Sequence, residues 1–85
     1  MKRRNEPALG SLMKSIARKS RRVGQPSLSQ FVELSLATGL GAWALKMSDE
    51  ALQEGRPNAA EDFHNAAVSS LADADDMLTA LLRTP

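Results

Sequence analysis

The stretch "VGQPSLSQ", residues 23–30, separates two helical patterns and sets the architecture of the chain. Gly24 readily adopts the conformations that end a helix, and Pro26 biases the residue before it away from the α region. Ser27 followed three residues later by Gln30 has the capping-box pattern, in which each side chain bonds the backbone N–H of the other residue. The stretch therefore predicts a helix end, a turn and the start of a second helix.

Upstream of this break, apolar residues recur at three- and four-residue steps, at Leu9, Leu12, Met13 and Ile16. This spacing predicts an amphipathic helix over about residues 8–21. The opposite side of the helix is basic, and a basic arm of residues 1–7 precedes it.

Downstream, a long helix is expected over about residues 28–54, with two apolar rows. The bulky row is Leu36, Leu40, Trp43 and Met47, and the second row is Leu34, Gly41, Leu45 and Leu52. Because both rows need cover, we expect this helix to lie centrally between its neighbours. Gly39 and Gly41 each disfavour a helix interior by about 1 kcal/mol relative to alanine, which indicates close backbone approach or a local kink.

The tract "EGRPN", residues 54–58, marks a second break, and a third helix is expected over about residues 59–82. Its small and apolar residues form a heptad seam: Ala60, Phe63, Ala67, Ser70, Ala74, Met77 and Leu81. The predicted fold is all-α, a single small helical domain over residues 8–85. A basic N-terminal helix is followed by a long antiparallel helical hairpin, which the first helix or a second copy must cover.

Size and composition limit the protein further. A chain of 85 residues without cysteine has neither a disulfide framework nor a thiolate metal site to supplement its small core, so a homodimer is expected. No apolar segment follows the first cations as in an export signal, and the uncharged run over residues 34–45 is shorter than a membrane span. We expect a cytoplasmic protein without a membrane partner.

The net charge of +1 conceals an uneven distribution. Residues 1–25 contain eight cations and one acid, whereas the remaining sixty residues contain three cations and nine acids. Clustered cations of this kind bind the phosphates of nucleic acids. The candidate nucleic-acid-binding residues are Lys2, Arg3, Arg4, Lys14, Arg18, Lys19, Arg21 and Arg22. Alternatively, these cations form a solvated face or pair with the acidic hairpin.

The run "VGQPSLSQFVEL", residues 23–34, resembles the turn and second helix of ribbon-helix-helix DNA-binding proteins. That resemblance implies a DNA-reading strand within residues 2–6 and a second helix that supports a dimer. The run is also similar to the start of the recognition helix in helix-turn-helix regulators. This second resemblance implies base contacts from the four polar residues of the run: Gln25, Ser27, Ser29 and Gln30.

Catalysis is not expected, because no nucleophile–base pair, phosphate-binding loop or catalytic carboxylate pair can be assembled. His64 has no second histidine at metal-ligand spacing and is interpreted as a helix-surface residue. Asp73, Asp75 and Asp76 lack the glycine and glutamate of a calcium loop and are interpreted as a solvated helix face. We therefore expect neither a metal nor a cofactor.

The leading hypothesis is a small nonenzymatic nucleic-acid-binding or accessory protein. The basic helix would contact phosphate, and the acidic hairpin would oligomerise. The alternative is an all-helical protein-binding module, such as an adaptor, chaperone or inhibitor, docked on a larger acidic protein. The expected oligomer or partner interface comprises the large apolar residues of the two long helices: Leu36, Leu40, Trp43, Met47, Phe63, Leu71, Met77, Leu78 and Leu81.

Overall fold

The computed structural model describes residues 9–83, which form three helices and no strand. The helices are α1 (Leu9–Val23), α2 (Leu28–Gln53) and α3 (Pro57–Arg83). The all-α prediction is confirmed, and each predicted boundary lies within two residues of the observed one. The basic arm, including the strand that the ribbon-helix-helix resemblance implies, lies outside the described residues.

The turn between α1 and α2 has the predicted chemistry. Gly24 has φ 78°, and its N–H donates to the carbonyl of Ser20 at 3.4 Å, which closes α1. At the start of α2, the backbone N–H of Gln30 donates to Ser27 Oγ at 3.2 Å. In return, the N–H of Ser27 donates to Gln30 Oε1 at 2.9 Å. The capping box predicted from the sequence is confirmed.

The turn between α2 and α3 is a Schellman motif centred on Gly55, which has φ 75°. The N–H of Gly55 donates to the carbonyl of Leu52 at 3.1 Å, and the N–H of Arg56 donates to that of Ala51 at 2.8 Å. Pro57 then occupies the first turn of α3, where its fixed φ is favourable and its missing N–H is not needed. These features reverse the chain within a few residues.

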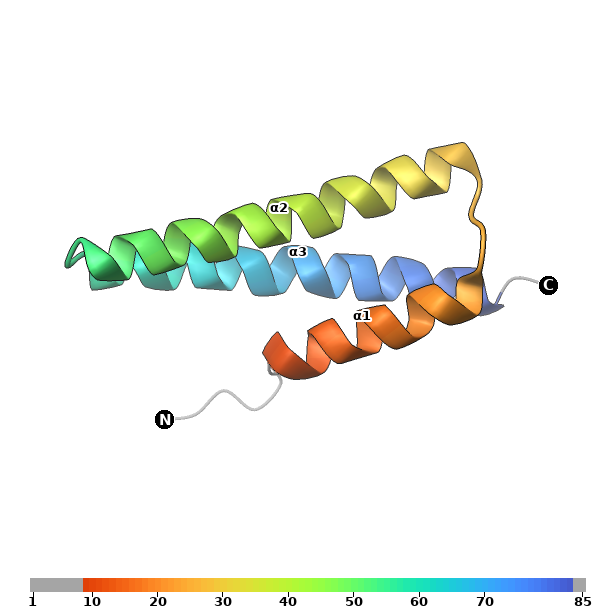
Figure 1. Cartoon of the computed structure of the whole chain (residues 1–85), viewed down its shortest axis with the longest axis horizontal. Coiled ribbons are helices and arrows are strands. Elements are labelled where there is room, and N and C mark those ends of the chain that lie inside the picture. Colours follow the sequence, from red (N-terminus) through yellow and green to blue (C-terminus); the bar gives the residue numbers. More distant parts are fainter. Residues whose placement is uncertain (1–8, 84–85) are drawn as a thin grey trace.

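The central helix is α3 (Figure 1). α2 runs antiparallel to α3 along its length, and α1 lies beside the C-terminal half of α3, running in the same direction. The backbones of α1 and α2 do not approach each other closely. The expectation that α2 would be the central helix is therefore wrong, because α1 packs on α3 and leaves the bulky row of α2 uncovered.

The interface between α2 and α3 is built mainly from alanine. Ala51, Ala67 and Ala74 are fully buried, and their neighbours Ala44 and Ala60 are nearly so. The alanine half of the predicted heptad seam thus packs on α2, whereas the larger half, Phe63, Met77 and Leu81 with Ser70, is only partly buried. Small side chains allow the two helices to lie close together.

Gly41 lies in the α2–α3 interface, where the Leu71 side chain of α3 packs against the backbone of α2. A Cβ atom on Gly41 would lie 2.8 Å from two side-chain carbons of Leu71. Close approach, one of the two predicted roles of this glycine, is therefore what the structure shows.

Candidate functional site

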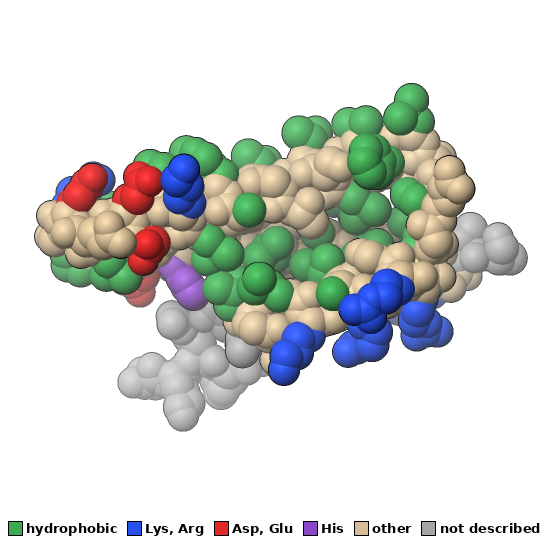
Figure 2. Space-filling model, in the orientation of Figure 1, with side chains coloured by type: hydrophobic (Ala, Val, Ile, Leu, Met, Phe, Trp, Pro, Cys, Tyr) green, Lys and Arg blue, Asp and Glu red, His purple; other side chains and the backbone are tan. Residues whose placement is uncertain are grey.

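An apolar groove separates α1 from α2, and α3 forms its floor. Figure 2 shows hydrophobic side chains exposed in the space between the two helices. We call this the α1–α2 groove. Its lining from α1 is Met13, Ile16, Ala17, Ser20 and Val23; its lining from α2 is Phe31, Leu34, Ser35, Thr38, Ala42 and Leu45; its floor is Leu71 and Leu78.

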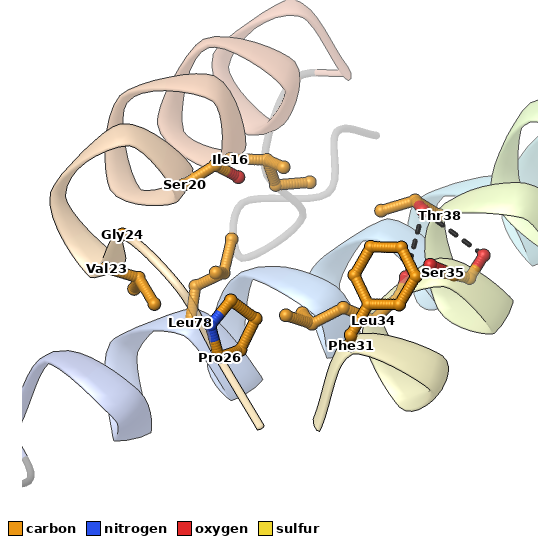
Figure 3. Close-up of a pocket in the computed structure, with 10 residues that line it drawn as sticks. All are labelled: Ile16, Ser20, Val23, Gly24, Pro26, Phe31, Leu34, Ser35, Thr38 and Leu78. Carbon is orange, nitrogen blue, oxygen red and sulfur yellow. Dashed lines mark hydrogen bonds between the residues drawn. The ribbon is translucent and has the colours of Figure 1, made fainter. Parts of the chain in front are cut away.

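A hollow of about 290 Å³ lies in the groove near the α1–α2 turn (Figure 3). Ile16 and Val23 line it from α1, Phe31 faces it from α2, and Leu78 lies between them. Thr38 is polar, but its hydroxyl donates to the backbone carbonyl of Leu34 at 2.9 Å. This hydrogen bond satisfies the hydroxyl, so the hollow presents mainly hydrocarbon.

A second hollow of about 260 Å³ continues the groove toward the middle of α2. Met13 and Ala17 form its α1 side, and Ala42 and Leu45 form its α2 side. Ile16 and Thr38 line both hollows, so the two are parts of one groove. Most of this lining was not predicted from the sequence, although a third row on α2 recurs at helical spacing: Phe31, Ser35, Thr38, Ala42 and Leu45.

A polar cluster centred on Asp75 holds α1 against α3. One carboxylate oxygen of Asp75 accepts a hydrogen bond from Ser15 Oγ at 2.6 Å, and the other pairs with Lys19 Nζ at 3.1 Å. Lys19 Nζ also donates to Thr79 Oγ1 at 2.8 Å. The interpretation of Asp75 as a solvated residue is therefore wrong, and Lys19 is a cation that the hairpin binds.

This environment changes the acidity of Asp75. Burial alone would raise the pKa of its carboxyl group. The hydrogen bonds from Ser15 and Lys19, with the charges of Lys19 and Arg18, act in the opposite direction and leave the pKa below its ordinary value of 3.8. The ionised carboxylate is therefore stabilised in the folded state.

Acid should weaken the attachment of α1. Because the folded pKa of Asp75 is depressed, its contribution to stability is complete above the unfolded pKa and is lost as pH falls through the folded pKa. We expect the free energy of unfolding to decrease below about pH 4, measured by urea denaturation at several pH values. The Asp75→Asn variant should be less stable at neutral pH and should show a smaller decrease in acid; an equal decrease would contradict this prediction.

The other candidate phosphate-binding cations of α1 remain on the surface. Lys14, Arg18, Arg21 and Arg22 are exposed and form no ion pair with any residue from 9 to 83. Figure 2 shows Lys and Arg side chains along this helix. Lys2, Arg3 and Arg4 lie outside the described residues.

The four candidate base-contacting residues divide into two pairs. Ser27 and Gln30 bond each other's backbone in the capping box, so these side chains already have partners. Gln25 and Ser29 are exposed. The structure therefore gives the capping residues a local structural role.

The expected interface residues also separate into two groups. Leu71 and Leu78 are buried inside the three-helix fold, with 6% and 2% of their surface exposed. Leu36, Leu40 and Trp43 are more than half exposed, and Met47, Phe63, Met77 and Leu81 are partly buried. The ring of Trp43 contacts that of Phe63 edge to face, with centroids 5.7 Å apart.

Within residues 9–83, no group of three His, Asp or Glu side chains is placed to hold a metal ion. In the same range, no helix combines the length and the apolar character needed to cross a membrane. His64 is exposed on α3, as predicted.

The chain matches no known family model, and no curated protein or solved structure is significantly similar to it.

Proposed function

We propose that this chain is a nonenzymatic, all-helical protein-binding module that takes an amphipathic helix of a larger protein into the α1–α2 groove. The open groove between α1 and α2 is the observation that carries the proposal. Apolar side chains of all three helices line it along one continuous channel. Exposed apolar surfaces of this kind mark sites of interaction.

The shape of the groove favours a helix as the occupant. α1 and α2 run antiparallel on the same side of α3, so an added helix between them would contact both and complete a four-helix arrangement. α1 has 15 residues, which span about 22 Å at 1.5 Å per residue. The groove therefore suits a helix of about four turns, with apolar anchors at i, i+3 or i+4, and i+7.

The charge at the edges of the groove favours an acidic partner. Lys14 and Arg21 lie three residues before and four residues after Ala17, so they share its row on α1 and flank the groove. On the α2 side, residues 34–45 have no charge. An occupant with carboxylates along the flank next to α1 would be attracted by these cations and would be selected over a basic helix.

A displayed library of amphipathic helical peptides, varied in charge along one flank, tests the proposal. We expect selection of peptides with the i, i+3/i+4, i+7 apolar spacing and an acidic flank. Filling the groove with Ala17→Trp or Ala42→Trp should weaken their binding at least tenfold. Ala66→Trp, an exposed alanine of α3 that lines neither hollow, is the matched control and should change the affinity less than twofold.

The charge of the occupant has its own test. The double variant Lys14→Glu/Arg21→Glu should reduce binding of acidic peptides and remove its salt dependence. Peptides that bind equally well to the groove-filling variants and to the parent protein would overturn the proposal.

Polyanion binding is a second candidate function, favoured by the four exposed α1 cations that have no ion-pair partner among residues 9–83. Such a face would bind phosphates without sequence readout. A fluorescence-anisotropy titration with duplex DNA at low and high salt tests it. Binding should weaken steeply with salt and with the Arg18→Ala/Arg21→Ala/Arg22→Ala variant, but not with Arg56→Ala, since Arg56 already pairs with Glu54 at 2.6 Å. Absence of binding at low salt would exclude this function.

A further inference from the structure

A second apolar surface of α2 faces away from α1. We call it the outer stripe: Val32, Leu36, Leu40, Trp43 and Met47. Three of its members, Leu36, Leu40 and Trp43, are 60%, 56% and 53% exposed. Hydrophobic side chains project along the outer edge of α2 in Figure 2. The edge-to-face contact of Trp43 with Phe63 continues the surface onto α3.

In this protomer many of the buried side chains are small and many of the exposed apolar side chains are large, the reverse of the usual arrangement. Among residues 9–83, six of the ten buried hydrophobic residues are alanines, whereas the largest apolar side chains of α2 are exposed. A chain of 85 residues that leaves its large apolar groups in water forgoes much of the stabilisation that burial provides. The outer stripe is therefore a surface that an assembly would cover.

Gly39 and Gly41 differ in a way that indicates where this cover lies. Gly41 is required within the protomer, because Leu71 occupies the space of a Cβ atom. At Gly39, by contrast, a Cβ atom would meet nothing within 4 Å. Glycine weakens a helix interior, and the described part of the chain contains no contact that requires it here. Close approach of another backbone would require it.

The outer stripe is symmetric about Gly39 and Leu40. Leu36 and Trp43 are equidistant from the midpoint between these two residues, and so are Val32 and Met47. Antiparallel pairing of two copies of α2 would therefore place Leu36 of one copy opposite Trp43 of the other. The same pairing would place Gly39 of each copy opposite Leu40 of the other, next to the twofold axis, where the missing side chain of the glycine lets the helix backbones approach.

The distribution of charge sets the direction of this pairing. Between Glu33 and Lys46 the helix is uncharged. The end of the hairpin, residues 46–62, contains five acids and two cations, whereas α1 contains five cations and no acid. Figure 2 shows the acidic side chains at the hairpin end and the cations along α1, toward the other end. Antiparallel pairing separates the two acidic ends, whereas parallel pairing would place acid beside acid.

The outer stripe spans residues 32–47, which is about 24 Å of α2 at 1.5 Å per residue. The contact of Trp43 with Phe63 widens it onto α3. From these features together we propose that the chain forms a twofold dimer through the outer stripe, with the α2 helices antiparallel and crossing at Gly39. The proposal is independent of the α1–α2 groove, which lies on another side of α2.

Sedimentation equilibrium tests the dimer. The parent chain should sediment at twice its mass of 9.2 kDa. The emission of Trp43, the only tryptophan, should shift to shorter wavelength as the concentration rises through the dissociation constant. Leu36→Glu should yield a monomer. Leu52→Glu changes another α2 leucine that is also 60% exposed but lies off the stripe, and it should remain dimeric. A monomeric parent chain, or equal effects of the two variants, would overturn the proposal.

Cross-linking through engineered cysteines tests the geometry without depending on the fold of a charged variant. Since the chain has no cysteine, each engineered thiol reacts only with its mate. With a short bismaleimide, Leu40→Cys should cross-link to itself, and a mixture of Leu36→Cys and Trp43→Cys chains should form the mixed dimer. Leu36→Cys alone should react poorly; efficient reaction would indicate parallel packing and overturn the antiparallel arrangement.

The Gly39→Ala variant distinguishes a glycine needed at the dimer interface from one needed only for the fold of the separate chain. The alanine should raise the dissociation constant at least tenfold, although it favours the helix of the separate chain. An unchanged dissociation constant would overturn the crossing at Gly39.

Discussion

Gly41→Val is expected to lower the free energy of unfolding by about 2–3 kcal/mol, because overpacking a tight interface forces side chains or backbone to move. The new Cβ atom would lie 2.8 Å from two carbons of Leu71, which is itself only 6% exposed. Since Leu71 packs in the cluster that holds α1, the displacement would affect all three helices. Urea denaturation followed by circular dichroism measures the effect.

Two further variants isolate the steric origin of this effect. Ala42→Val introduces the same β-branched residue at the next, exposed position, and should lower the stability by only about 0.5 kcal/mol. In a double-mutant cycle, Leu71→Ala should relieve much of the effect of Gly41→Val, so that the double variant loses less stability than the two single variants combined. Strict additivity would show that Gly41 and Leu71 do not interact.

Asp75→Lys is expected to lower the free energy of unfolding by about 2 kcal/mol and to release α1 from the hairpin. The substitution removes the acceptor of Ser15 and Lys19 and places a third cation beside Lys19 and Arg18. The side chains of Lys19 and Asp75 are 22% and 18% exposed, so solvent screens this repulsion only in part. A helix of 15 residues is marginal without packing, and α1 should lose its helical signal.

The matched control for this charge change is the neighbouring residue. Asp76→Lys alters the net charge identically, but Asp76 is exposed and makes no hydrogen bond or ion pair within the described part of the chain. Circular dichroism and urea denaturation should distinguish the two variants. Because α1 forms one wall of the α1–α2 groove, Asp75→Lys should also abolish peptide binding there. Equal behaviour of the two variants would contradict the anchoring role of Asp75.

Local features of the fold were predictable from the sequence because they depend on neighbouring residues. The capping box of Ser27 and Gln30, the helix ends at Gly24 and Gly55 and the three helical periods all act within a few positions. The close approach at Gly41 was one of two predicted roles, but its partner Leu71 is thirty residues away. Periodicity identifies a face that needs cover without identifying what covers it.

The arrangement of the helices was less predictable, because it depends on contacts between residues that are far apart in the sequence. Two apolar rows on α2 suggested a central helix, yet α1 packs on α3 through Leu12 and the Asp75 cluster. Asp75 lies between two other acidic residues at 73 and 76, so its sequence context indicated solvent. Its partners are 56 and 60 residues away, and no local pattern separates Lys19 from the exposed cations beside it. The α1–α2 groove was missed because it exists only between helices that are placed by these distant contacts.

α1 runs parallel to α3 and is attached to its C-terminal half, and this arrangement affects the order in which the helices fold. During synthesis α1 is made before α2 and α3, and the residues that hold it, from Val68 to Thr79, belong to the third of these helices. The α2–α3 hairpin closes through a short turn and contacts near in sequence, whereas α1 must close a loop of nearly sixty residues. The hairpin is therefore expected to assemble before α1 docks. In the folded protein α1 is attached only through residues distant in sequence, so we expect it to detach before the α2–α3 hairpin opens. Its amide hydrogens should therefore exchange with solvent before those of the hairpin.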